Sequence, residues 1–141
     1  MPVTARRNTS RRLVLELLLV ALLAGFGDDF PRNVSAGTAW SFLGRHALEL
    51  GHATVGTAVL LEALNLVARS VRGGGARAVG ALTVAGLVLV GISAASGVWF
   101  VTSRQPDSAL TSMTLGWISA LVVYATIWYH ARQALRAAST G

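Results

Sequence analysis

The 141-residue sequence contains no cysteine, no lysine and only three prolines. The absence of cysteine excludes a small secreted scaffold held together by disulfides. Charged residues are also scarce, because they form 13% of the chain where soluble domains carry about 25%. Hydrophobic residues form 53%, and the mean hydropathy is +0.58. This composition excludes a disordered chain and an ordinary soluble enzyme, and it predicts a protein embedded in lipid.

All twelve basic residues are arginines, and they give the chain a formal net charge of +6. A nucleic-acid-binding protein would gather such charges on one polar face. Here the arginines form short clusters between apolar segments, which is typical of the signals that set membrane topology. We therefore expect the lipid bilayer as a partner and no nucleic acid.

Four apolar segments predict helices at about 12–27, 42–69, 79–102 and 109–131, within one membrane domain spanning 1–141. About 20 residues of helix cross the hydrocarbon core, so the last two segments fit, the second exceeds it and the first is short. The first segment also resembles a secretory signal peptide, because arginines precede it. Glu16 interrupts its apolar run and no clear A-x-A cleavage site follows, which favours a retained helix. The predicted fold is an all-α integral membrane protein, a four-helix antiparallel bundle.

The arginines also predict the orientation of this bundle. With the N-terminus inside, three arginines fall on the outer side: Arg32, Arg45 and Arg104. Nine fall on the inner side: Arg6, Arg7, Arg11, Arg12, Arg69, Arg72, Arg77, Arg132 and Arg136. The positive-inside rule then predicts a multi-pass protein of the cytoplasmic membrane with both termini in the cytoplasm.

Polar residues inside the membrane are costly, and the second apolar segment holds most of them. On a continuous helix, Arg45, Glu49, His52 and Gly56 would fall on one face, within about 60° of one another. This places a cation, a carboxylate and an imidazole on one face near the outer leaflet. That face is expected to point toward the bundle interior or toward water.

A second polar strip, formed by Glu62, Asn65 and Arg69, follows toward the inner leaflet. It is interpreted either as part of a polar cavity or proton path, or as a structural strip in which Glu62 pairs with Arg69. Glu16 lies four residues after Arg12, which predicts a local ion pair. Glu16 and Glu62 are also expected at similar depths, where two carboxylates can bind a cation or share a proton.

The sequence carries no phosphate-binding loop, no dinucleotide fingerprint and no zinc-protease motif, so no catalytic residue and no metal site are predicted. Small residues recur in the third apolar segment at spacings that allow helix backbones to approach closely in lipid. These are Gly86, Gly91, Ser93, Ala95 and Gly97. Their face is expected to pack inside the bundle or to form a dimer.

The three histidines raise the question of haem b. Paired ligation requires imidazoles from two helices at one depth, whereas His46 and His52 share one segment and point about 120° apart. His130 lies at the opposite side of the membrane and is interpreted as an interfacial residue. His52 alone is kept as a candidate haem ligand.

The stretch from Phe100 onward, together with His52, is similar to a group of small uncharacterised four-helix membrane proteins of actinobacteria. The matching residues are Phe100, Ser103, Gln105, Ser108, Met113 and Gly116. The layout also resembles cytochrome b561-like bundles, but their paired histidines on separate helices are missing. The resemblance implies a fold and a compartment, without an activity.

These observations favour a non-enzymatic membrane subunit that packs against itself or against a partner membrane protein. Two alternatives stay open. One is a haem b-binding or electron-transfer module that uses His52. The other is a small-solute or proton-coupled carrier that uses Glu62, with Asn65 and Glu16.

Overall fold

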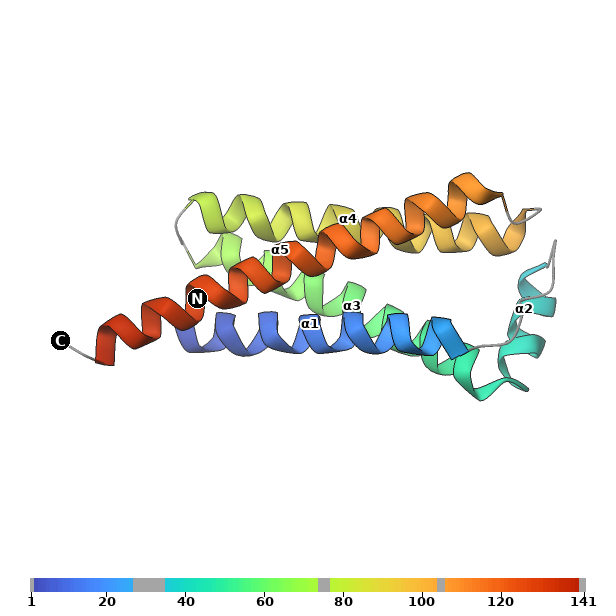
Figure 1. Ribbon diagram of the computed structural model, residues 1–141, viewed down its shortest axis with the longest axis horizontal. Helices are drawn as coiled ribbons and strands as arrows, with labels where there is room; N and C mark the ends of the chain where they lie inside the picture. Colours follow the sequence, from blue (N-terminus) through green and yellow to red (C-terminus); the bar gives the residue numbers. More distant parts are fainter. Residues whose placement is uncertain (1, 27–34, 74–76, 104–105, 140–141) are drawn as a thin grey trace.

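The computed structural model describes residues 2–26, 35–73, 77–103 and 106–139. Within these ranges all the regular structure is helical, which confirms the all-α class. The helices are α1 (Val3–Phe26), α2 (Ala36–Leu43), α3 (Ala47–Arg72), α4 (Arg77–Thr102) and α5 (Asp107–Ser139). Figure 1 shows the four long helices side by side. The short α2 lies at one end of this bundle, and α1 begins and α5 ends at the other.

Three of the helices, α3, α4 and α5, are long and apolar enough to cross a membrane. At 1.5 Å per residue, the 26 residues of α3 extend about 39 Å, against about 30 Å for the hydrocarbon core. α1 has 24 residues, but Arg11, Arg12 and Glu16 lie within it. Large apolar side chains such as Leu61, Val88 and Val122 are more than half exposed, as expected for surfaces that face lipid.

The predicted helix at 42–69 is two helices separated by a turn. Ser35 caps α2 by accepting a hydrogen bond from the Thr38 amide. α2 ends at Leu43, and the amide of Gly44, which follows it, donates to the Trp40 carbonyl at 3.0 Å. The amides of Arg45 and His46 continue as tight turn bonds to residues three positions earlier. Glycine is poorly suited to a helix interior, which favours a break at Gly44. Because apolar residues lie on both sides of the turn, apolar patterning did not predict it.

α1 and α5 are longer than their apolar segments. α1 begins at Val3 rather than near residue 12, and its first turn includes the bond from the Arg6 amide to the Pro2 carbonyl. α5 continues to Ser139, well past residue 131. An apolar segment marks only the part of a helix that can lie in lipid. Arg, Ala and Gln also favour helix, so both helices continue beyond the ends of their apolar segments.

The buried core lies in the half of the bundle near the termini. Each long helix contributes to it, and the residues from α1, α3 and α5 are spaced three or four apart, which is the pattern of one helix face. The core residues are Leu13, Val14, Leu17, Val59, Ala63, Leu66, Val90, Ala120, Tyr124 and Ile127. The indole Nε1 of Trp117 donates a 2.8 Å hydrogen bond to the Leu17 carbonyl, which ties α5 to α1 at the limit of this core.

Candidate functional site

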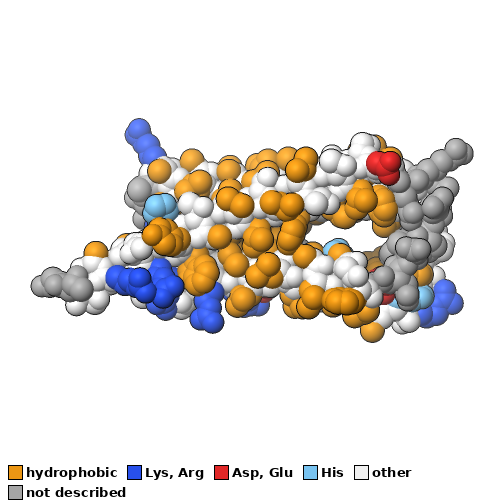
Figure 2. All heavy atoms as spheres, in the orientation of Figure 1, with side chains coloured by type: hydrophobic (Ala, Val, Ile, Leu, Met, Phe, Trp, Pro, Cys, Tyr) orange, Lys and Arg blue, Asp and Glu red, His pale blue; other side chains and the backbone are white. Residues whose placement is uncertain are grey.

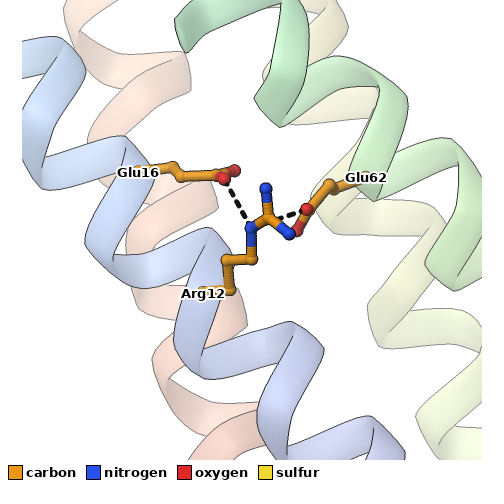
Figure 3. Close-up of polar contacts among 3 residues, drawn as sticks. All are labelled: Arg12, Glu16 and Glu62. Carbon is orange, nitrogen blue, oxygen red and sulfur yellow. Dashed lines mark hydrogen bonds and ion pairs between the residues drawn. The ribbon is translucent and has the colours of Figure 1, made fainter.

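A polar cluster joins α1 to α3 within the core half of the bundle (Figure 3). The Nε atom of Arg12 lies 2.8 Å from a carboxylate oxygen of Glu16 and 2.8 Å from one of Glu62. The expected pair of Arg12 with Glu16 is therefore confirmed, and the two carboxylates do meet at one depth. Among the described residues Glu62 forms its ion pair with Arg12 and none with Arg69, although the charge of Arg69 still acts on Glu62. Arg69 lies seven residues along α3, about 10.5 Å of axial rise, whereas α1 brings Arg12 alongside Glu62.

The cluster has fewer positive than negative groups. One guanidinium faces two carboxylates, so the three side chains carry a net charge of −1 when both glutamates are ionised. Oε2 of Glu16 and Oε2 of Glu62 are buried without a hydrogen-bond partner among the described residues. Arg12 is two-thirds exposed, whereas the glutamates are 15% and 20% exposed. The carboxylates therefore depend on Arg12 for compensation, because unpaired charge is costly away from water.

The predicted outer polar face does not form as expected. Arg45 lies in the exposed turn before α3, so it does not share a helical face with Glu49 and His52. Glu49 lies in the first turn of α3, where the helix dipole favours a negative charge. The Nδ1–H of His52 donates to the Val20 carbonyl at 3.0 Å and so links α3 to α1. The bond fixes the tautomer, leaving Nε2 as the free ring nitrogen.

The predicted inner strip is also divided. Glu62 points toward α1, but Asn65 and Arg69 are exposed. Arg69 lines a cavity of about 250 Å³ with Arg72 at the end of the bundle that holds the termini. A single interior path through Glu62, Asn65 and Arg69 is therefore not formed.

The other two histidines are held locally. His46 stacks on Phe42, with ring centroids 3.9 Å apart, and its Nδ1–H donates to the Phe42 carbonyl at 2.8 Å. His130 is exposed and contacts the ring of Tyr129 edge-on. No group of three metal-ligating side chains occurs in the described part of the chain. His52 is thus the histidine whose position between two helices suits it to a further interaction.

Some small residues of α4 pack against α5. A Cβ atom at Gly86 would lie 2.7 Å from Cζ of Tyr124, and one at Gly97 would lie 3.4 Å from the sulfur of Met113. Ser93 donates a 2.9 Å hydrogen bond to the Met113 carbonyl. On α5, a Cβ at Gly116 would lie 3.0 Å from the Leu89 carbonyl oxygen, a close contact that the α4 spacing alone did not reveal.

Gly91 and Ala95 do not take part in this packing. A Cβ at Gly91 would meet no atom within 4 Å, and Ala95 is exposed. The interpretation of Gly91 as a close contact inside the bundle is therefore wrong. The reason is angular, because residue 91 points about 140° away from Gly86 on the helix.

Toward α2, the pair α1–α3 separates from the pair α4–α5. Figure 2 shows an opening between the two pairs at the α2 end, with a histidine side chain at its rim. The core-facing stripes of three helices continue into this region with small residues that no other described residue covers. Ala24 of α1 and Ala94 of α4 are exposed, and a Cβ at Gly56 of α3 would meet no atom within 4 Å.

The residues that carried the resemblance have mixed positions. Met113 and Gly116 contact α4, and His52 contacts α1. Phe100 and Ser103 lie at the end of α4, and Ser108 lies in the first turn of α5. Gln105 lies outside the described residues, as do most of the segment between α1 and α2 and the glycine-rich turn. The searches against protein-family models, curated proteins and solved structures found no match.

Proposed function

We propose that the protein is a non-enzymatic subunit of a membrane complex, which receives a transmembrane helix of another chain in the opening at its α2 end. The observation that carries this proposal is the unfilled continuation of the core at Ala24, Gly56 and Ala94. Helices associate in lipid through small residues that let their backbones approach closely. Three helices present such residues here, and no helix of the described chain packs on them.

A helix suits the opening better than a lipid acyl chain does, because a polar group lies on the same stripe. His52 is four residues before Gly56 on α3, and its Nδ1 is already bonded to Val20. No described residue bonds to Nε2, which needs a hydrogen-bond partner where lipid excludes water. A neighbouring helix can supply a hydroxyl or amide side chain, whereas a hydrocarbon tail cannot.

The proposal includes a membrane arrangement. α1, α3, α4 and α5 cross the cytoplasmic membrane as an antiparallel bundle, and both termini lie in the cytoplasm. Support comes from nine arginines that lie at the starts of α1 and α4 and at the ends of α3 and α5. Among the described arginines, Arg45 is the one near α2.

Photo-crosslinking in native membranes tests the occupant. The photoreactive residue p-benzoylphenylalanine is placed at Ala94, with lipid-facing Val88 as the control position. We expect a protein adduct of one discrete mass from position 94 and none from position 88. The mass distinguishes a second copy of the chain from a different protein.

Filling the opening then tests whether the adduct depends on it. Gly56→Leu should abolish the adduct, because the new side chain occupies the space of the incoming helix. Gly80→Leu is the matched control, since a Cβ there also meets no atom within 4 Å but the residue lies at the opposite end of α4. An adduct that contains lipid alone, or one that persists in Gly56→Leu, would reject the proposal.

A haem b-binding module is the second candidate, and the bond between His52 and Val20 favours it. A backbone carbonyl that accepts from Nδ1 orients the ring and leaves Nε2 available to a metal. An absorption spectrum of protein purified in mild detergent tests this candidate. A Soret band that disappears in His52→Leu supports it, and a colourless protein rejects it.

A further inference from the structure

A cavity of about 310 Å³ lies where the start of α1 meets the last third of α5. It is lined by Arg7 and Arg11 of α1 and by Trp128 and Arg132 of α5. Figure 2 shows basic side chains gathered at this end of the molecule. None of these residues belongs to the Arg12 cluster or to the opening at the α2 end.

Among the described residues, no acidic side chain forms an ion pair with any of the three arginines of the cavity. Nε and Nη2 of Arg7 donate to Oδ1 of Asn8, which is an uncharged acceptor. Across the described residues, Arg11 and Arg132 form no ion pair and no side-chain hydrogen bond, and the nearby Glu16 is bound by Arg12. Like charges around one space repel one another, and an anion among them turns that repulsion into attraction.

The position of the cavity relative to the membrane indicates which anion is present next to it. Arg11 lies two residues before Leu13, where the apolar part of α1 begins, and Trp128 lies on the membrane-crossing candidate α5. Tryptophan concentrates at the boundary between hydrocarbon and headgroups. The phosphates of the lipids lie in that same layer, just outside the hydrocarbon core.

We propose that this cavity binds the phosphate group of an anionic phospholipid. Guanidinium groups donate paired hydrogen bonds that match phosphate oxygens, so Arg11 and Arg132 hold the phosphate from two helices, and Arg7 adds positive charge. The ring of Trp128 packs beside the glycerol region of the lipid. The smaller cavity at Arg69 and Arg72 has two arginines and no aromatic ring among its lining residues.

Native mass spectrometry of the full-length protein in mild detergent tests the site. The probes are phosphatidylglycerol, phosphatidylcholine with the same acyl chains, and inorganic phosphate. We expect the protein to retain one phosphatidylglycerol in preference to phosphatidylcholine. Because a hydrogen bond to a charged group contributes about 1.5 kcal/mol or more, Arg132→Gln should weaken retention by about tenfold.

Arg77→Gln is the control of equal charge, because Arg77 is exposed at the start of α4 and lines neither cavity. It should change the retention of phosphatidylglycerol by less than about twofold, since surface charges contribute little. Helical circular dichroism confirms that both variants are folded. Equal losses in the two variants, or equal retention of the two lipids, would overturn the site. Displacement of phosphatidylglycerol by an equal concentration of inorganic phosphate would assign the site to free phosphate and overturn the lipid proposal.

Discussion

Arg12 holds a position on which two other charged residues depend. Its guanidinium compensates Glu16 on the same helix and Glu62 on α3, and each glutamate keeps a second oxygen buried with no hydrogen-bond partner in the described part of the chain. The cluster therefore acts as a polar joint between α1 and α3 in a region otherwise packed by apolar side chains. A joint of this kind fixes the register of the two helices, because a shift of one residue would rotate Arg12 away from Glu62.

We expect Arg12→Gln to destabilise the protein more than Glu62→Gln does. Loss of the arginine leaves two carboxylates without the guanidinium that contacts both of them, whereas loss of one glutamate leaves a balanced pair. Thermal unfolding in detergent, followed by circular dichroism, measures the difference in midpoint temperature. Arg77→Gln serves as the control for loss of one positive charge. A lower midpoint for Glu62→Gln than for Arg12→Gln would contradict the proposed role of Arg12.

The sequence predicted half of this cluster. A spacing of four residues is sufficient to pair Arg12 with Glu16, since both lie on one helix. The contact with Glu62 depends on how α1 is rotated against α3, and no local pattern specifies that rotation. Arg69 was the nearer candidate along the chain, but it is exposed on α3, and the described residues include no ion pair between it and Glu62.

Among the helices, α4 presents two different small-residue surfaces. Gly86, Ser93 and Gly97 face α5, whereas Gly91 and Ala95 face outward. The spacing of four residues predicted close packing for both sets of small residues. Such spacing shows which residues share a helix face, but it does not show where a partner helix lies. Only the three-dimensional arrangement distinguishes the glycines that pack against α5 from the glycine that lies on the outward-facing surface.

Leucine substitutions should distinguish these two surfaces. Gly86→Leu should destabilise the fold by about 3 kcal/mol or more, since the side chain collides with the buried ring of Tyr124 and overpacking of even one methylene costs about 1–3 kcal/mol. Gly91→Leu should leave the stability of the isolated protein unchanged within about 0.5 kcal/mol, because its side chain enters open space. Unfolding by denaturant in detergent measures both. Equal destabilisation by the two variants would contradict the assignment of the surfaces.

The helix boundaries show where apolar patterning fails as a guide. Apolar residues lie on both sides of the short turn between α2 and α3, so apolar patterning predicts one helix from 42 to 69. The local signals for the break were Ser35 as a cap before α2 and Gly44 after it. At α1 and α5 the predicted helices were too short, because both helices extend into polar sequence. A search for apolar segments does not include such sequence.

At the scale of the whole molecule, charge and packing divide the bundle into two unlike halves. The half near the termini holds the core, the Arg12 cluster and nearly all the described arginines. The half near α2 holds the opening, where the helix pairs separate. The composition predicted a membrane protein of packed helices. It did not predict this division, because a stripe of small residues looks the same in a sequence whether a partner covers it or not.

The concentration of arginines at one end predicts the orientation of the chain, and topology reporters test it. Alkaline phosphatase is active only outside the cytoplasm, whereas green fluorescent protein fluoresces when it folds inside. We expect fusions at both termini to fluoresce and to lack phosphatase activity, because translocating nine arginines across the membrane is strongly disfavoured. A phosphatase inserted between residues 103 and 106 should be active, since one crossing by α5 separates that point from the C-terminus. Termini that report from opposite sides would mean that α1 does not cross, leaving the three apolar helices α3, α4 and α5 as the spans. The Arg12 cluster would then have to form at the membrane surface, with α1 lying outside the bilayer.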